Sequence, residues 1–382
     1  MQPNATRVRI ISVVGARPEF VQVAVLSREL RRRHEEILIH TGQHYDAGMS
    51  GRFFEDLAIP RPDLNLGIES RSPSIQTGNM IGALASAIAP LDADLVVVRG
   101  DTNSTLAGAI VAKQLLLPLA HVEAGMRSYD RTMPEEINRV VTDHLADLQL
   151  VTDDDARVRL AAEGIVRGIY VCGDVMYDLF LRARERAAAS LTESLSALAR
   201  APFALLTLHR AENTDDRERL RAIVDGFSDA PLPVIFPVHP RTRARLTEFD
   251  IVLPSPIVAT EPLGYLEIVA LECAARTIFT DSGGVQREAY FAGVPCVTLR
   301  DTTEWTNTVD AGWNRLAGAD SAAIAAFCRD PPGVQPERPP LFGDGNASVR
   351  IAAAFDAPET AAILAQARAT RRARAHAAAS ER

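Results

Sequence analysis

Thr280-Asp281-Ser282-Gly283-Gly284-Val285-Gln286-Arg287-Glu288-Ala289 joins an apolar strand, expected at residues 276–280, to an amphipathic helix. Its two adjacent glycines let the chain turn sharply and let a ligand approach the backbone. The first amides of the following helix have no partner inside it and carry partial positive charge, so they favour an anion. Ser282 adds a hydroxyl, and the Glu288 carboxylate suits ribose hydroxyls. We interpret the segment as a phosphate-binding turn; the alternative is a serine that only caps the helix.

Short apolar runs followed by helical patterns recur on both sides of this segment. This alternation predicts parallel sheets with helices on both faces, an α/β fold in which the carboxyl ends of the strands face a ligand crevice. The expected strands are residues 8–14, 37–40, 94–98, 117–122 and 147–151 in the first half, and 203–208, 233–237, 251–253, 277–279 and 295–299 in the second.

The alternation is interrupted near Gly173 by a helical stretch that is expected to reach about Arg200. We therefore predict two doubly wound domains, residues 1–172 and 173–345. An Ala-rich helix, broken near Pro358, follows, and its part at 359–376 is expected to pack back on the first domain. The arginine-containing end of this helix is expected to fray.

The composition narrows the possible partners. The chain has 382 residues, a formal net charge of −8 and no basic block before its C-terminal tail, which argues against nucleic acid. Its four cysteines are widely spaced, so we expect neither a zinc ribbon nor disulfides, and a reducing cytoplasm. No apolar run reaches the roughly 18 residues that span a bilayer, so no membrane partner is expected.

Three carboxylates of the first half are candidates for proton chemistry. Asp101 follows the strand at 94–98, and its alternative role is a helix N-cap. Glu123 lies directly after an apolar strand, where a purely structural role is hard to explain. Glu135 has a strong alternative, because Thr132 and Glu135 have the spacing of a capping box with Pro134 in the first turn.

In the second half, His209 and Arg210 follow the first strand and are expected to donate to a ligand. His239 is enclosed by prolines and is expected to be structural, whereas His44 and His121 remain open. No histidines have metal-ligand spacing, so no metal is expected. The turn Gly15-Ala16-Arg17-Pro18 lacks the nicotinamide-binding glycine pattern, and no Walker motif is present. Phosphate donors in one half and carboxylates in the other suit chemistry on a nucleotide-activated group.

The chain resembles the non-hydrolysing UDP-N-acetylglucosamine 2-epimerases. The motifs that carry the resemblance are Gly15–Glu19, Thr41–His44, Gly100–Thr102, His121–Arg127, Pro134–Arg139, His209–Arg210, Thr280–Gln286, Arg300–Glu304 and Gly343–Gly345. The resemblance implies two Rossmann-like domains of the glycosyltransferase-B type with the active site in the interdomain cleft, a homodimer, and no cofactor. It also implies elimination of UDP to a 2-acetamidoglucal, followed by re-addition with inversion at C2.

By the same resemblance, Asp101, Glu123, Glu135 and His209 are the catalytic residues. The UDP-binding residues are Arg17, Arg210, Ser282, Gly283, Gly284, Glu288 and Arg315, and Gln43 and His44 resemble part of a regulatory substrate site.

The chain departs from the family pattern at two positions. Gln22 stands where many members have lysine, and Arg287-Glu288 replaces a common pair of glutamates. The continuation to Trp305 also resembles the branch that acts on UDP-2,3-diacetamido-2,3-dideoxyglucuronate; Arg287 would suit a uronate unless its side chain faces solvent. Other open alternatives are a hydrolysing variant that releases free sugar and UDP, a sugar transferase of the same architecture, and a non-catalytic UDP-sugar sensor.

Overall fold

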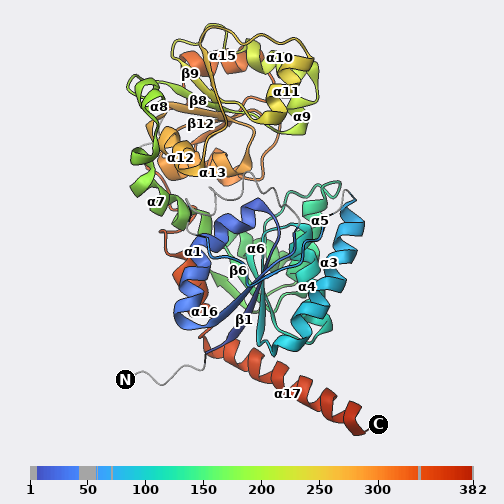
Figure 1. The fold of residues 1–382 in the computed structure, drawn as a ribbon. Helices are drawn as coiled ribbons and strands as arrows, with labels where there is room; N and C mark the ends of the chain where they lie inside the picture. Colours follow the sequence, from blue (N-terminus) through green and yellow to red (C-terminus); the bar gives the residue numbers. More distant parts are fainter. Residues whose placement is uncertain (1–6, 43–56, 58, 70–71, 334–336, 381–382) are drawn as a thin grey trace. The chain divides into compact units, whose positions relative to one another are not determined.

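The computed structural model describes residues 7–42, 57, 59–69, 72–333 and 337–380 (Figure 1). The chain forms two compact units: unit 1 comprises Met1–Leu179 and Phe342–Arg382, and unit 2 comprises Phe180–Leu341. Helix α7 (Val175–Ala187) contains the point at which the chain passes from the first unit to the second.

Unit 1 is built on a parallel sheet of seven strands in the order β3-β2-β1-β4-β5-β6-β7. Apolar β-branched residues dominate its central strands, as expected for strands buried on both faces. In chain order the strands are β1 (Arg9–Val14), β2 (Glu35–His40), β3 (Leu64–Asn65), β4 (Leu95–Arg99), β5 (Leu119–Ala124), β6 (Leu148–Val151) and β7 (Ile169–Val171).

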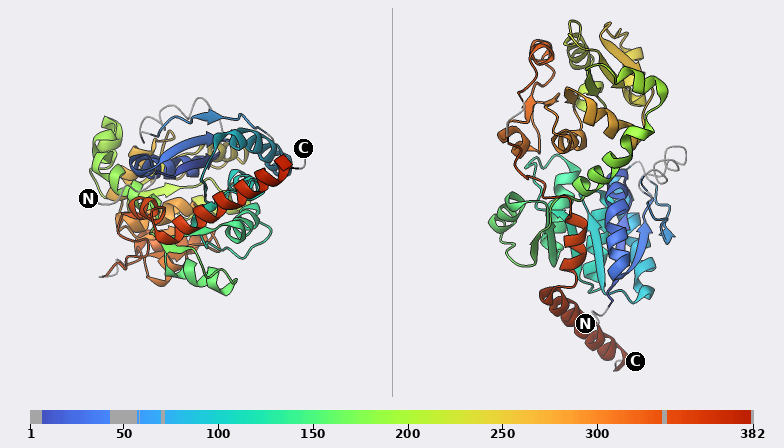
Figure 2. Two further views of the ribbon diagram at one scale, coloured as in Figure 1. Left: turned by 90° about the horizontal axis from the view of Figure 1, so that it is seen from below. Right: turned by 90° about the vertical axis from the view of Figure 1, so that its left-hand side faces the viewer.

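Helices cover both faces of this sheet. Helices α1 (Arg17–Arg33) and α16 (Ala347–Ala354) lie together on one face, and α3 (Pro73–Ile88), α4 (Asn103–Gln114) and α5 (Pro134–Leu145) lie on the other (Figures 1 and 2). Alternate strand residues such as Val13 and Val98 pack with α3 and α4 in one fully buried cluster. Among the described residues, the other helices of unit 1 are η1 (Ala89–Leu91), α6 (Asp154–Ala162) and α17 (Pro358–Ser380).

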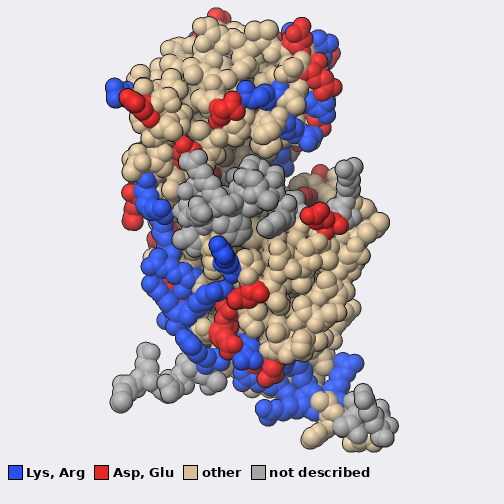
Figure 3. Space-filling model, in the orientation of Figure 1, with Lys and Arg blue, Asp and Glu red and all other residues tan. Residues whose placement is uncertain are grey.

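The C-terminal segment is tied to unit 1 by polar contacts. The buried Asp178 carboxylate accepts from the Ala347 and Ser348 amides at the start of α16, at 2.9 and 2.7 Å. Further on, Arg368 of α17 donates to Asp94 at 2.8 Å. The helix breaks before Pro358, as predicted, but the expected fraying is wrong, because α17 continues to Ser380. Arginines of α17 and of the last turn of α1 gather on the face seen in Figure 3.

Unit 2 contains a second parallel sheet, of six strands in the order β10-β9-β8-β11-β12-β13. Helices α10, α11 and α15 pack on one face of it, and α8, α12 and α13 pack on the other. The strands are β8 (Ala204–Thr207), β9 (Val234–Pro237), β10 (Ile257–Thr260), β11 (Thr277–Thr280), β12 (Cys296–Thr298) and β13 (Asn314–Leu316). The helices are η2 (Ala188–Ser190), α8 (Glu193–Leu198), α9 (Ala211–Thr214), α10 (Arg217–Asp225), α11 (Pro240–Glu248), α12 (Tyr265–Ala274), α13 (Gly283–Ala292), α14 (Thr306–Asp310) and α15 (Ser321–Arg329).

Some local predictions were wrong. Residues 251–253 are not a strand: Ile251 closes the turn after α11, and the strand forms at β10, beyond Pro254 and Pro256. The helical stretch expected to reach Arg200 divides into α7, η2 and α8, with the break at residues 191–192. Strands β3, β7 and β13 were missed, because two or three residues are too few to show a period.

In both sheets, the direction in which successive strands are added reverses next to the first strand. In unit 1 the chain moves outward from β1 through β2 and β3, and then returns to continue from β4; in unit 2, β8 and β11 are the corresponding neighbours. In doubly wound sheets the ligand binds at this point of reversal, beyond the carboxyl ends of the strands. The predicted fold class, α/β with two doubly wound parallel sheets, is confirmed.

Candidate active site

Asp101 lies just beyond β4, and Glu123 is the penultimate residue of the neighbouring strand β5. Strands β4 and β5 are paired, and the Gly100 amide still donates to the Val122 carbonyl at 3.0 Å, so Asp101 and Glu123 lie close together at the same edge of the sheet. The Asp101 carboxylate forms an ion pair with Arg139 of α5. Thr102, not Asp101, is the N-cap of α4, so the capping alternative for Asp101 is wrong.

Glu123 has an unusual backbone conformation. Its φ is +69°, in the left-handed region, and the pairing of β5 with β6 shifts register between Val122 and Ala124. Such a bulge redirects a side chain at the end of a strand, and a non-glycine residue in this conformation is strained. Gly125 completes the turn with φ +77°, and a Cβ there would lie 2.7 Å from the Ala156 carbonyl oxygen.

Glu135 is exposed in the first turn of α5. It precedes Asn138 and Arg139 by three and four residues, so all three lie on one helix face. Asn138 and Arg139 both contact Asp101, so Glu135 belongs to the same edge of unit 1. The predicted capping box is absent: Met133 is the N-cap, and Thr132 bonds to Asp130 instead.

A buried network supports the loops that carry Asp101 and Glu123. The two nitrogens of His121 contact the Asp143 carboxylate at 2.6 Å and the Gly100 carbonyl at 2.8 Å. Asp143 also accepts from Arg127 at 2.6 Å and from the Gly125 amide at 3.1 Å. Burial opposes ionisation of Asp143, but His121 and Arg127 outweigh it, so its pKa lies below the ordinary value. His121 is therefore a buried residue that holds the loop before Asp101 in place.

Glu19 is a second buried support. Its carboxylate accepts from the Gly15 and Ala16 amides at 2.6 and 2.7 Å, and from the hydroxyls of Thr102 and Thr105 at 2.9 and 3.1 Å. Burial raises the pKa of Glu19, and these four donors oppose the rise. The carboxylate thus ties the start of α1 to the start of α4, on either side of the point where the sheet reverses.

In unit 2, the buried Asp281 organises the equivalent edge. Its carboxylate accepts from the His209 and Arg210 amides at 3.1 and 2.9 Å and from Asn213 at 3.2 Å, and the His209 ring lies 3.3 Å away. Strands β8 and β11 are neighbours, so Asp281 joins the two loops at their carboxyl ends. The His209 side chain is 41% exposed, which leaves it accessible to a ligand.

The glycine turn after β11 contains a helix N-cap, Ser282, and leaves space beside Gly284. Ser282 is the N-cap of α13 and accepts from the Val285 amide at 3.5 Å, so the alternative of a capping serine holds for this residue. A Cβ on Gly283 would lie 2.4 Å from a Glu304 oxygen, whereas a Cβ on Gly284 would meet only the Ser282 hydroxyl, at 3.7 Å. A side chain at 283 would therefore displace the Glu304 carboxylate, whereas the internal packing of unit 2 leaves room for one at 284.

The acidic residue of α13, Glu288, lies in a buried acidic group. It is 6% exposed and adjoins Glu272 and the Tyr265 phenol. Burial and the neighbouring Glu288 carboxylate raise the pKa of Glu272 well above its ordinary value. The preceding Arg287 does not face solvent: it is 9% exposed and lies 4.3 Å above the Trp305 ring.

Of the other predicted site residues, Arg315 is not brought into these two groups. Arg315 is exposed on the edge strand β13, level with Val297, and does not follow a strand end. Arg17 is the first residue of α1, and the description does not extend to its side chain. Gln43 and His44 lie outside the described residues. His239 caps α11 by accepting from the Arg241 amide at 3.2 Å, the structural role expected of it.

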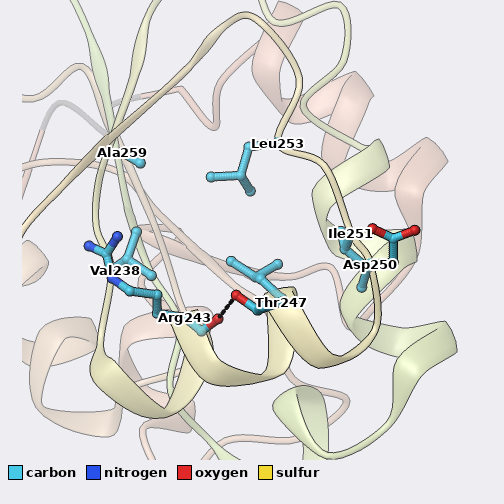
Figure 4. Close-up of a pocket in the computed structure, with 8 residues that line it drawn as sticks. Val238, Arg243, Thr247, Asp250, Ile251, Leu253 and Ala259 are labelled. Carbon is cyan, nitrogen blue, oxygen red and sulfur yellow. Dashed lines mark hydrogen bonds between the residues drawn. The ribbon is translucent and has the colours of Figure 1, made fainter.

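A surface hollow beside α11 is separate from the predicted residues (Figure 4). It is lined by Val238, Arg243, Leu246, Thr247, Asp250, Ile251, Leu253 and Ala259. None of these was a candidate, so we do not place the site there. Within the described part of the chain, no group of three or more His, Cys, Asp or Glu side chains could hold a metal ion.

The supporting roles of several residues were not predicted from the sequence. Arg139 had a local signal, because it follows Glu135 by one helical turn. Asp281 lies inside the glycine motif, but its role could be predicted only with the knowledge that β8 and β11 are neighbours. Asp143 had no local signal, since its partner His121 is 22 residues away. Glu19 and Gln22 stood at noted positions, but their contacts with Thr102 and Glu123 span 83 and 101 residues.

Comparison with known proteins identifies the family. A family model described as UDP-N-acetylglucosamine 2-epimerase matches residues 28–356. The chain belongs to the UDP-N-acetylglucosamine 2-epimerase family. The resemblance inferred from the motifs is therefore confirmed, and the protein is an epimerase of this family.

Two relatives with similar sequences carry the names of different UDP-sugar epimerases. A UDP-N-acetylglucosamine 2-epimerase homolog of Methanococcus maripaludis is 45% identical over 350 residues, covering 90% of this chain and 98% of the relative. The UDP-2,3-diacetamido-2,3-dideoxy-D-glucuronate 2-epimerase of Pseudomonas aeruginosa is 42% identical, with the same two coverages.

Solved structures of the family share the fold. The Methanocaldococcus jannaschii UDP-GlcNAc 2-epimerase in complex with UDP-GlcNAc and UDP is similar with a TM-score of 0.80 and 40% identity, over 91% of this chain and 98% of that one. The Neisseria meningitidis enzyme bound to UDP-GlcNAc gives a TM-score of 0.79 at 26% identity, over 91% and 99%. In this epimerase, no described helix has the length and apolar character to cross a bilayer.

Replacing Glu272 by Gln should flatten the pH dependence of stability. The folded pKa of Glu272 is raised above its ordinary value of 4.5, so the folded state keeps a proton that the unfolded state loses. Its contribution to stability is complete below pH 4.5 and is lost as the pH rises, by up to about 1.4 kcal/mol per pH unit. Thermal unfolding from pH 5 to 8 should show a smaller decline for Glu272→Gln. The exposed Glu185→Gln is the control, and equal declines in all three proteins would contradict the assignment.

Proposed function

We propose that this epimerase inverts C2 of a UDP-2-acetamido sugar, converting UDP-GlcNAc to UDP-ManNAc. The observation that carries the proposal is the position of the two polar groups. Each lies at the carboxyl ends of strands at or next to a point of reversal, where α/β sheets bind ligands: carboxylates in unit 1, and a glycine turn with His209 and Arg210 in unit 2. The similarity to the M. jannaschii enzyme, whose structure contains UDP-GlcNAc and UDP, supports the choice of substrate.

The chemistry must overcome the low acidity of the C2 hydrogen, which is not next to a carbonyl. We propose elimination: a base takes the C2 proton while the C1–O bond to UDP breaks, giving a 2-acetamidoglucal and UDP. In the second step UDP adds back to C1, and a proton is delivered to the opposite face of C2. The sequence is redox-neutral, and every proton and electron pair removed in the first step is returned in the second.

Unit 1 supplies the proton chemistry in this proposal. Two faces of C2 require two groups, and Asp101 and Glu123 leave adjacent strand ends, with Glu135 exposed on the helix that contacts Asp101. Positioned acids and bases of this kind typically accelerate proton transfer by about 10²–10⁴-fold. The buried supports, Glu19 and the His121–Asp143 pair, keep their loops from moving during the two transfers.

Unit 2 supplies the stabilisation of the leaving group. Negative charge grows on the pyrophosphate as the C1–O bond breaks, and donors already directed at that position lower the barrier. We assign this role to the start of α13 at Ser282, Gly283 and Gly284, together with His209 and Arg210. Arg17 and Arg315 are proposed further contacts of UDP, and Glu288 is proposed to accept from the ribose hydroxyls. Gln43 and His44 are proposed to belong to a regulatory substrate site.

A second candidate substrate is UDP-2,3-diacetamido-2,3-dideoxyglucuronate. The specific observation in its favour is the P. aeruginosa relative, which carries that name at 42% identity over nearly its whole length. The reaction at C2 would be the same. Arg287 is not assigned to a uronate, since its buried guanidinium lies over Trp305.

We further propose a cytoplasmic homodimer that supplies sugars for polysaccharide biosynthesis. The support is the family membership, together with the four free cysteines, three of which are buried. Burial raises the pKa of Cys172 and of Cys296 to about 12, which makes these thiols unreactive.

Incubation of the pure protein with each UDP-sugar in deuterated water tests the reaction. With no added cofactor or acceptor, we expect deuterium at C2 and the epimer at equilibrium, because the proton is lost and regained. Free sugar accumulating with UDP would indicate the hydrolysing variant, and turnover only with an added acceptor would indicate a transferase. No exchange with either UDP-sugar would contradict the proposal and favour a sensor.

Asp101→Asn and Glu123→Gln should each lower turnover by about 100-fold or more, since each removes a proton-transfer group while keeping its shape. Their affinity for UDP, measured by calorimetry, should stay within about twofold, because neither carboxylate is among the residues proposed to contact UDP. Asp154→Asn, at an exposed position on α6, is the control. Wild-type turnover in both site variants would mean that these carboxylates are structural.

Gly284→Ala should separate folding from binding. The added Cβ meets only Ser282 at 3.7 Å, and alanine is the better helix former, so the melting temperature should be unchanged or slightly higher. UDP affinity should fall about tenfold, since a methyl group would occupy space assigned to phosphate. The exposed Gly82→Ala on α3 provides the control. Unaltered UDP affinity in Gly284→Ala would rule out a phosphate beside Gly284.

A further inference from the structure

The Gln22 carboxamide is buried in unit 1 and contacts Glu123. Gln22 lies on α1 and is 4% exposed, and its Nε2 donates to Glu123 Oε2 at 2.5 Å. The two residues are 101 positions apart, so only the tertiary fold brings them together. An ionised carboxylate accepts hydrogen bonds and cannot donate, so the amide nitrogen must be the atom that faces Glu123. This fixes the orientation of the carboxamide.

The oxygen at the other end of this carboxamide is unsatisfied. Gln22 Oε1 is buried and has no hydrogen-bond partner within the part of the chain that the structure describes. Buried amide oxygens are nearly always paired, because the loss of hydration is costly. From ordinary bond lengths, Oε1 lies about 2.3 Å from Nε2 and hence within about 5 Å of Glu123 Oε2. An unused acceptor therefore lies next to the proposed acid/base group.

We infer that Gln22 is a positioning and specificity residue of the epimerase that uses both ends of its side chain. Nε2 holds the Glu123 carboxylate, and Oε1 accepts a hydrogen bond from the N–H of the 2-acetamido group of the substrate. The inference rests on the proposed function, which assigns Glu123 to the chemistry at C2. The acetamido nitrogen is bonded to C2, so a group that places Glu123 at C2 also places Oε1 near that N–H.

The neutral carboxamide suits this double role. An ammonium group at the same place would donate to Glu123 but offer no acceptor, and a carboxylate would accept but repel Glu123. The strained backbone of Glu123, at φ +69°, gives its side chain a defined direction, and the hydrogen bond from Gln22 fixes one of its oxygens. Gln22 thereby links recognition of the C2 substituent to the position of the Glu123 carboxylate.

Three substitutions of Gln22 distinguish the role of Nε2 from that of Oε1. Gln22→Lys keeps a donor toward Glu123 and loses the acceptor, so KM for UDP-GlcNAc should rise about fivefold to tenfold with kcat nearly unchanged. Gln22→Glu keeps an acceptor but places a like charge beside Glu123, so kcat should fall about tenfold or more. Gln22→Leu loses both and should show both defects. UDP lacks the sugar, so its dissociation constant should stay at the wild-type value in all three variants.

The controls distinguish this inference from a structural role and from the proposed function. Exposed Gln114→Leu should behave as wild type. Wild-type kcat and KM in Gln22→Leu, or UDP affinity and melting temperature falling together in all three variants, would overturn the inference. Glu123→Gln is measured alongside: if it is fully active, the assignment of Glu123 fails, whereas an inactive Glu123→Gln with an unaffected Gln22→Leu leaves that assignment intact and removes only Gln22.

Discussion

The parallel arrangement of the strands is the constraint on which the rest of this structure depends. When all strands of a sheet run in one direction, all their carboxyl ends lie along one edge, and the loops that leave that edge are free of strand pairing. Where the strand order reverses, two such loops run away from each other and leave room for a ligand. The chain contains this arrangement twice, at β1 and β4 and at β8 and β11, and the polar residues of each unit gather there.

Buried carboxylates convert this open edge into a defined site. Glu19, Asp143 and Asp281 are each almost completely buried, and each accepts at least two hydrogen bonds, from backbone amides of the loops and from side chains. A buried charge is costly unless it is paired, so each loop is held in the one conformation that satisfies its carboxylate. The exposed groups proposed to meet substrate, such as His209 and Glu135, are thereby supported by residues that substrate does not need to touch.

The two units have different proposed roles, and the charges of their polar groups differ accordingly. Unit 1 presents carboxylates that can accept and return a proton, and unit 2 presents backbone amides, a histidine and an arginine that suit a pyrophosphate. The net charge of −8 gives no general attraction for an anionic substrate, so the local donors must provide it. Glu288 does not fit this division by charge, since it lies among other acidic groups in the unit that is proposed to bind phosphate.

Strand ends could be predicted from the sequence, because an apolar run followed by a polar residue is a local pattern. Asp101, Glu123, His209 and Ser282 were identified in this way, and the order of the motifs indicated the family. Contacts between distant residues could not be predicted. The left-handed backbone of Glu123, the hydrogen bond from Gln22, the joining of two loops by Asp281 and the burial of Arg287 over Trp305 each depend on which elements become neighbours. The sequence by itself determined the fold class and the residue types at the edge of each sheet, whereas the tertiary structure decided which side chains hold them, because packing joins residues that no sequence period relates.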